Sequence, residues 1–89
     1  MVRKRVIVSG LVQGVFFRDS CRRAALGHRV AGWVRNRPDG TVEAVFEGPP
    51  PRVDRMVAWA WRGPTRAAVE SITVYDEEPE GLDTFRIRS

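Results

Sequence analysis

The chain has 89 residues, enough for one compact domain and too few for two separate hydrophobic cores, so we expect a single domain over residues 1–89. Its 15 Lys and Arg against 11 Asp and Glu give a net charge of +4, which favours anionic ligands without identifying one. A single cysteine excludes an internal disulfide, and no apolar run is long enough for a membrane span or a signal sequence, so we expect a cytoplasmic protein.

The first part of the chain predicts a strand, a turn and a helix. Residues 4–9 are rich in β-branched side chains and end at Gly10, which is typical of a strand. Residues 17–28 then change to a helical period. One side of this predicted helix carries Phe17, Cys21, Ala24, Ala25 and His28. We therefore expect an amphipathic helix in which Cys21 is a packing residue and His28, at the helix end, is packed or half-exposed and does not act as a base.

The middle of the chain predicts a hairpin followed by a second helix. Residues 30–36 and 41–47 have strand patterns, and the "RPDG" between them consists of turn-forming residues. Three prolines at 49–51 are compatible with the start of a helix. Apolar residues recur at helical spacing from Val53 onward, and Gly63 with Pro64 ends the pattern.

The last part predicts a fourth strand at residues 67–75 and a short fifth strand at 84–88. The order is then β-α-β-β-α-β with a terminal strand. This order predicts an α+β two-layer sandwich of the ferredoxin-like type, with both helices on one face of a mostly antiparallel sheet and the other face open to solvent. Since this arrangement serves enzymes, RNA-binding proteins and metal carriers, the fold alone does not define a function.

The stretch "GLVQGVFFRD" (10–19) combines a glycine-containing turn with an arginine at the start of a helix. Gly14 allows close backbone approach to a ligand, and residues 13–18 can direct several N–H groups at one point. Arg18 adds a forked pair of donors. The stretch predicts a phosphate site, although glycines alone more often indicate only a tight turn. Its predicted contacts are Gln13, Gly14, Val15, Phe16, Phe17 and Arg18.

Two segments resemble the signature motifs of the acylphosphatase family. "GLVQGVFFR" (10–18) is similar to the first motif and "GWVRNRPDGTV" (32–42) to the second. The resemblance continues through "EGP" at 47–49 to the C-terminal end, and so covers essentially the whole chain. It implies an enzyme that hydrolyses the carboxyl-phosphate anhydride of acyl phosphates.

The resemblance also implies roles for two side chains. The matching arginine, Arg18, binds the phosphoryl group, and the matching asparagine, Asn36, orients the attacking water. Because an acyl phosphate has a good leaving group, we expect no cofactor and no metal. One His and one Cys also do not make a usual zinc site. We expect a monomer that binds a small acyl phosphate and is inhibited by inorganic phosphate, with no membrane partner.

Two other functions are compatible with this fold. An RNA-binding domain would use the open sheet face, but the third strand places Glu43 and Glu47 there and we expect no aromatic residue to stack on bases. We therefore do not expect nucleic acid as a partner. A non-catalytic anion-binding domain is the second alternative, and the presence of both Arg18 and Asn36 argues against it.

Overall fold

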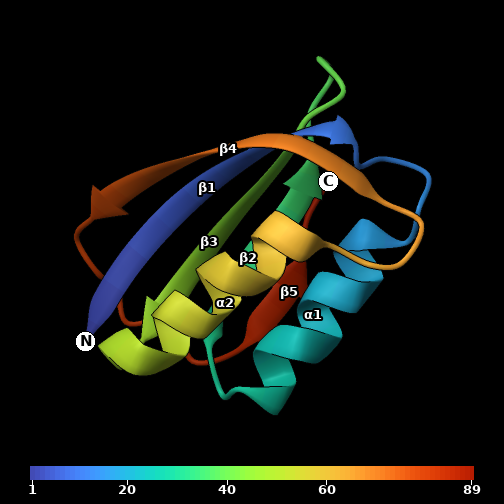
Figure 1. Ribbon diagram of the computed structural model, residues 1–89. Helices are drawn as coiled ribbons and strands as arrows, with labels where there is room; N and C mark the ends of the chain where they lie inside the picture. The colour runs from blue at the N-terminus through green and yellow to red at the C-terminus, as the bar shows by residue number, and fades with distance from the viewer.

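The structure, a computed structural model, describes residues 1–89 and has two layers. Helices α1 and α2 lie on one face of a five-stranded sheet (Figure 1). The sheet order is β4-β1-β3-β2-β5, and every pairing is antiparallel except that of β2 with β5. The predicted fold class is confirmed. The elements are β1 (Val2–Leu11), α1 (Phe17–Gly27), β2 (Ala31–Asn36), β3 (Val42–Gly48), α2 (Pro50–Arg62), β4 (Ala68–Glu77) and β5 (Phe85–Ile87).

The hydrophobic core fills the space between the helices and the sheet. The central strands contribute alternate side chains, among them Val6, Val8 and Phe46, all fully buried. Helix α1 adds Cys21, as expected from its position on the apolar side, and α2 adds Met56. Because β1 and β3 are antiparallel, the β1–α1 turn and the end of β3, which leads into α2, lie at opposite ends of the sheet (Figure 1).

Several element boundaries differ from the sequence-based expectation; the first strand, predicted over residues 4–9, runs from Val2 to Leu11. Helix α1 ends at Gly27, and His28 caps it as an exposed residue, so of its two expected environments the packed one is wrong. Strand β4 continues to Glu77, because its last residues pair with the start of β1. Arg3 and Glu77 are opposite each other in this pairing and form an ion pair at 2.9 Å.

The sheet face away from the helices is covered by ion pairs. Glu43 and Glu47 lie on this face, as the alternation along β3 predicted, yet they are 7% and 1% exposed. Arg3 reaches Glu47 at 2.7 Å, and Arg5 reaches Glu43 at 3.2 Å. The expectation of a solvated open face was therefore wrong at the centre of the sheet, because each carboxylate is desolvated together with its guanidinium partner.

Aromatic residues also lie on this open face, contrary to the expectation. Trp33 comes from β2 and Tyr75 from β4, the strands on either side of the central pair. The guanidinium of Arg88 is 4.5 Å from the Trp33 ring centroid, and that of Arg5 is 4.5 Å from the Tyr75 centroid. Arginines thus already occupy these rings through cation–π contacts.

The connection between β4 and β5, residues 78–84, is held by the carboxylate of Glu47; we call this connection the strap. It joins strands at opposite edges of the sheet. The backbone N–H groups of Glu80, Gly81 and Leu82 donate to Glu47 at 3.1, 3.1 and 3.2 Å. Burial disfavours the charged carboxylate, but the hydrogen bonds from Arg3 and from the strap outweigh this effect and hold the pKa of Glu47 below its usual value.

We predict that Glu47→Gln lowers the free energy of unfolding at neutral pH by roughly 3 to 5 kcal/mol, because it removes one partner of a buried ion pair. Urea unfolding measures the loss. Since the folded pKa lies below the unfolded one, this stabilisation is present above the unfolded glutamate pKa and is lost as the pH falls through the folded value. The difference between the two proteins should therefore shrink in acid.

Glu78→Gln is the matched control, because Glu78 is an exposed residue of the strap without an ion pair. We expect it to change the unfolding free energy by no more than about 0.5 kcal/mol. Equal stability of Glu47→Gln and the wild-type protein at neutral pH would show that Glu47 does not hold the strap.

Candidate anion-binding site

The turn between β1 and α1 has alternating backbone handedness. Gly14 has φ 73° and Phe16 has φ 62°, while Val15 between them is not in the left-handed region. Alternation of this kind turns successive N–H groups toward the same side and forms a concave nest for an anion. The N–H groups of residues 13–19 donate no hydrogen bond within the protein. They are therefore free to bind a ligand at the start of α1.

Phe16 and Phe17 have opposite environments. Phe16 adopts the left-handed conformation despite its large side chain, and its ring is 69% exposed. Phe17 is buried, and its ring packs edge-on against Trp59 of α2 with centroids 5.3 Å apart. This contact anchors the first turn of α1. It also accounts for Trp59 as a packing residue.

Gly10 does not belong to this nest. It lies in β1 at a shift in the pairing with β4, with φ 120°. A Cβ at this position would be 2.3 Å from the carbonyl oxygen of Ala68. Gly10 is thus required by the close approach of two strands, whereas Gly14 has open space around it and is required by its φ alone.

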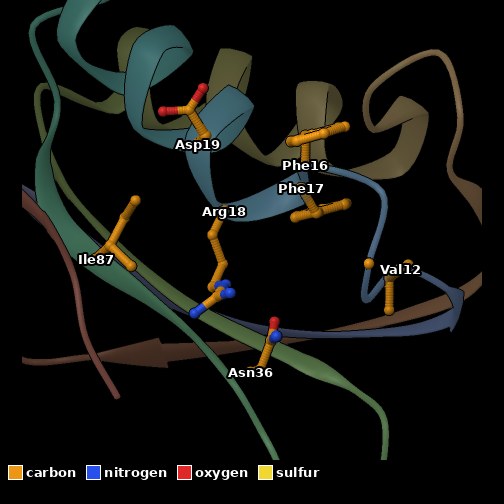
Figure 2. A pocket seen from close by; sticks show the side chains of 8 residues that line it. Val12, Phe16, Phe17, Arg18, Asp19, Asn36 and Ile87 are labelled. Carbon is orange, nitrogen blue, oxygen red and sulfur yellow. The ribbon is translucent and has the colours of Figure 1, made fainter.

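A pocket of about 370 Å³ opens in front of the nest, and Figure 2 shows its lining side chains. Three parts of the fold contribute: the β1–α1 turn with the first residues of α1, the end of β2, and the end of β5. Its lining residues are Val12, Gly14, Phe16, Phe17, Arg18, Asp19, Asn36 and Ile87.

Arg18 and Asn36 face each other across this pocket. The guanidinium of Arg18 and the carboxamide of Asn36 point toward one another (Figure 2). Arg18 is exposed and makes no ion pair, and neither side chain forms a hydrogen bond within the protein. By contrast, the carboxylate of Asp19 points away from the guanidinium of Arg18 and pairs with Arg23 at 2.7 Å. The pocket therefore combines one free cation with an unengaged amide.

Strand alternation explains the position of Asn36. Val34 and Asn36 lie on the same side of β2, and Val34 is completely buried beneath the helices. Asn36 is the last residue of the strand, so it reaches the edge of the core next to the start of α1. The sequence-predicted pair is thus brought together by the ends of two separate elements.

Two of the residues predicted to bind phosphate do not line the pocket. The side chain of Val15 is buried in the core. The side chain of Gln13 turns to the β2–β3 connection, where its Nε2 donates to the carbonyl oxygens of Arg37 and Thr41. Conversely, sequence reasoning missed Val12, Asp19 and Ile87; for Ile87 no local motif indicates that the end of β5 meets the turn after β1.

The site contains no arrangement typical of a metal centre or a thiol nucleophile. No three side chains among His, Cys, Asp and Glu converge in the structure. Cys21 is fully buried, and burial raises the pKa of its thiol. The thiol is thus neither accessible nor ionised at neutral pH. None of the helices is long and apolar enough to cross a membrane.

Comparisons with known proteins agree with the geometry. The family model described as Acylphosphatase matches residues 4–87. An acylphosphatase of Gloeobacter violaceus is 56% identical over 86 residues, covering 97% of this chain and 92% of the relative. One of Thermococcus kodakarensis is 52% identical over 86 residues, covering 97% and 94%. The crystal structure of acylphosphatase from Bacillus subtilis superposes with a TM-score of 0.96 at 38% identity, with both chains covered completely.

Proposed function

The chain belongs to the acylphosphatase family of enzymes, and from this premise we propose that it hydrolyses the carboxyl-phosphate anhydride of acyl phosphates, releasing a carboxylate and inorganic phosphate. The observation that carries the proposal is the unpaired guanidinium of Arg18, which faces the carboxamide of Asn36 beside a nest of free N–H groups. A small acyl phosphate is thus the partner of this site.

The nest and Arg18 hold the phosphoryl group. The N–H groups from Gln13 to Phe17 contribute fixed donors, and the guanidinium supplies two further donors in a planar fork. Each charge-assisted hydrogen bond contributes roughly 1.5 to 3 kcal/mol. Because these donors are already in place before the ligand binds, they also stabilise charge that develops on the phosphoryl oxygens during the reaction.

Asn36 orients the water that attacks phosphorus. Its carboxamide oxygen accepts a hydrogen bond from the water while its NH₂ group donates a hydrogen bond to a phosphoryl oxygen. As the new P–O bond forms, the bond to the bridging oxygen breaks, and its electron pair leaves with the carboxylate. Both protons of the water end up on the phosphate product, so one dianionic substrate and one water give a carboxylate and H₂PO₄⁻. The amide acts by alignment, since it is too weak a base to remove a proton.

The rest of the pocket supplies little that would recognise the acyl group. Beyond the phosphate-binding donors, the pocket is lined by apolar side chains, Val12 and Ile87 among them, and by Asp19, whose carboxylate pairs with Arg23; Arg18 is the only cation. One chain provides the whole site, which supports action as a monomer. The single cysteine is buried and unpaired, which fits a reducing compartment and supports a cytoplasmic location.

We predict that the purified protein releases phosphate from a small acyl phosphate such as acetyl phosphate, and acts little on phosphate monoesters, whose leaving groups are far worse. A chelator should not change the rate, because the proposed mechanism uses hydrogen bonds and one guanidinium. Loss of activity in the chelator, with recovery on addition of Mg²⁺ or Zn²⁺, would contradict this mechanism. Phosphate binding without any turnover would instead favour the non-catalytic anion-binding domain.

We predict that Arg18→Ala weakens competitive inhibition by inorganic phosphate roughly 10-fold to 100-fold, the equivalent of about one charge-assisted hydrogen bond, and lowers the rate as well. Arg18→Lys should recover little, because a point charge does not reproduce the fork. Arg22→Ala is the matched control: it removes an exposed, unpaired arginine from the same helix and should leave both quantities unchanged. Unaltered phosphate inhibition in Arg18→Ala would remove Arg18 from the phosphate site.

We predict that Asn36→Ala lowers the rate roughly 10²-fold to 10³-fold, by analogy with the loss of one oxyanion donor. Inhibition by phosphate should remain nearly unchanged, because the nest and Arg18 are intact. Asn36→Asp should be no faster, since its carboxylate would repel the substrate. Turnover and the phosphate inhibition constant are compared in folded variants. A large loss of phosphate affinity at a near-normal rate would make Asn36 a binding residue.

A further inference from the structure

The side chain of Gln13 links two loops that the sheet leaves unconnected. Its Nε2 donates to the carbonyl oxygen of Arg37 at 2.8 Å and to that of Thr41 at 2.9 Å. Since both partners can only accept, the amide nitrogen rather than its oxygen must face them. The side chain is half-buried, and both N–H groups of its amide donate in these two hydrogen bonds.

The two carbonyl groups lie at the two ends of the β2–β3 connection, residues 37–41. Arg37 directly follows Asn36, and Gln13 directly precedes Gly14, the first left-handed residue of the nest. One side chain thus joins the neighbour of the water-orienting amide to the neighbour of the phosphate nest. The Gln13 link is the name we use for these two hydrogen bonds.

No other hydrogen bond performs this task. The pairing of β1 with β3 ends at Val8 and Val42, before the β1–α1 turn begins. Apart from the Gln13 link, no hydrogen bond or ion pair joins residues 12–16 to residues 36–41. Gln13 thus makes the only direct hydrogen bonds between these two segments.

From this geometry we propose that Gln13 is a positioning residue, which sets the separation between the phosphate nest and the carboxamide of Asn36. The inference rests on the proposed function, because it assigns to Gln13 the alignment of the reacting water with phosphorus. Rates of such reactions are sensitive to small displacements, and a shift of about 1 Å can cost roughly 10²-fold.

Both carbonyl groups have a second partner, so the Gln13 link is not essential for the fold. The Arg37 oxygen also accepts from the N–H of Gly40 at 3.1 Å, and the Thr41 oxygen from the N–H of Arg37 at 2.9 Å. Asp39 holds the turn independently through two hydrogen bonds to Thr41. Loss of the Gln13 donors therefore leaves no buried carbonyl unsatisfied, and alignment can be separated from stability.

The test is a double-mutant cycle of Gln13→Met with Asn36→Ala, measured with acetyl phosphate as substrate and inorganic phosphate as inhibitor. Met keeps the length of the side chain and removes its donors. We expect Gln13→Met alone to lower kcat roughly 10-fold to 100-fold with phosphate inhibition nearly unchanged. In the Asn36→Ala background the same change should cost less than about 3-fold, because the group being positioned is absent.

Equal losses of kcat in both backgrounds, an unchanged kcat in Gln13→Met, or a loss confined to phosphate affinity would each overturn the proposal. Ser9→Ala is the matched control: it removes a hydrogen bond between β1 and Ser71 on the far side from the β2–β3 connection, and should leave kcat unchanged in both backgrounds.

Amide hydrogen exchange separates this proposal from the proposed function. Removal of the Gln13 link should accelerate exchange at Arg37 and Gly40, whose N–H groups close the β2–β3 connection. If the wild-type protein does not hydrolyse acetyl phosphate, the proposed function fails, and exchange alone decides whether Gln13 holds the connection. Unchanged exchange in Gln13→Met overturns the link itself.

Discussion

The left-handed conformation of Phe16 is the constraint on which the pocket depends. A bulky side chain at φ 62° is unfavourable on its own, and here it is maintained by its neighbours. On one side, Gly14 completes the alternation that turns the N–H groups inward. On the other, Phe17 is buried against Trp59 and fixes the first turn of α1. The backbone conformation that leaves the Phe16 ring exposed thus also orients the N–H groups of the nest. Arg18 comes directly after Phe17 in the first turn of α1, beside these groups.

The open face of the sheet contributes to the pocket from a distance. Arg3 and Glu47 hold the strap, and the strap leads to β5, which is only three residues long. Ile87 at the end of β5 forms one wall of the pocket. A buried ion pair gives little net stability compared with apolar packing, so its value here is geometric: it fixes the path by which the chain reaches the far edge of the sheet.

Most of the fold was predictable because local patterns and the fold agree. The alternation in β3 correctly assigned Glu43 and Glu47 to one face, and the change of period at Phe17 located α1. The burial of those glutamates was not predictable, because the arginines of β1 that pair with them, Arg5 and Arg3, lie 38 and 44 residues away in the sequence. For the same reason the direction of the Gln13 side chain was missed: its partners are 24 and 28 residues away. Within the site, the two sequence motifs located Arg18 and Asn36. The position of Ile87 could be found only once the order of the strands in the sheet was known.

The pairing of β1 with β4 has a kinetic consequence. The ion pair between Arg3 and Glu77 closes a separation of 74 residues, and β1 lies between β3 and β4 in the sheet. During synthesis from the N-terminus, β1 emerges first, yet it gains its outer neighbour only after α2 and β4 have been made. Contacts of such long range slow folding, because the chain loses the entropy of closing a long loop before the contact contributes any favourable energy. Until then one side of β1 has unpaired N–H and C=O groups, so the nascent chain passes through a stage in which its first strand is open to pairing with another chain.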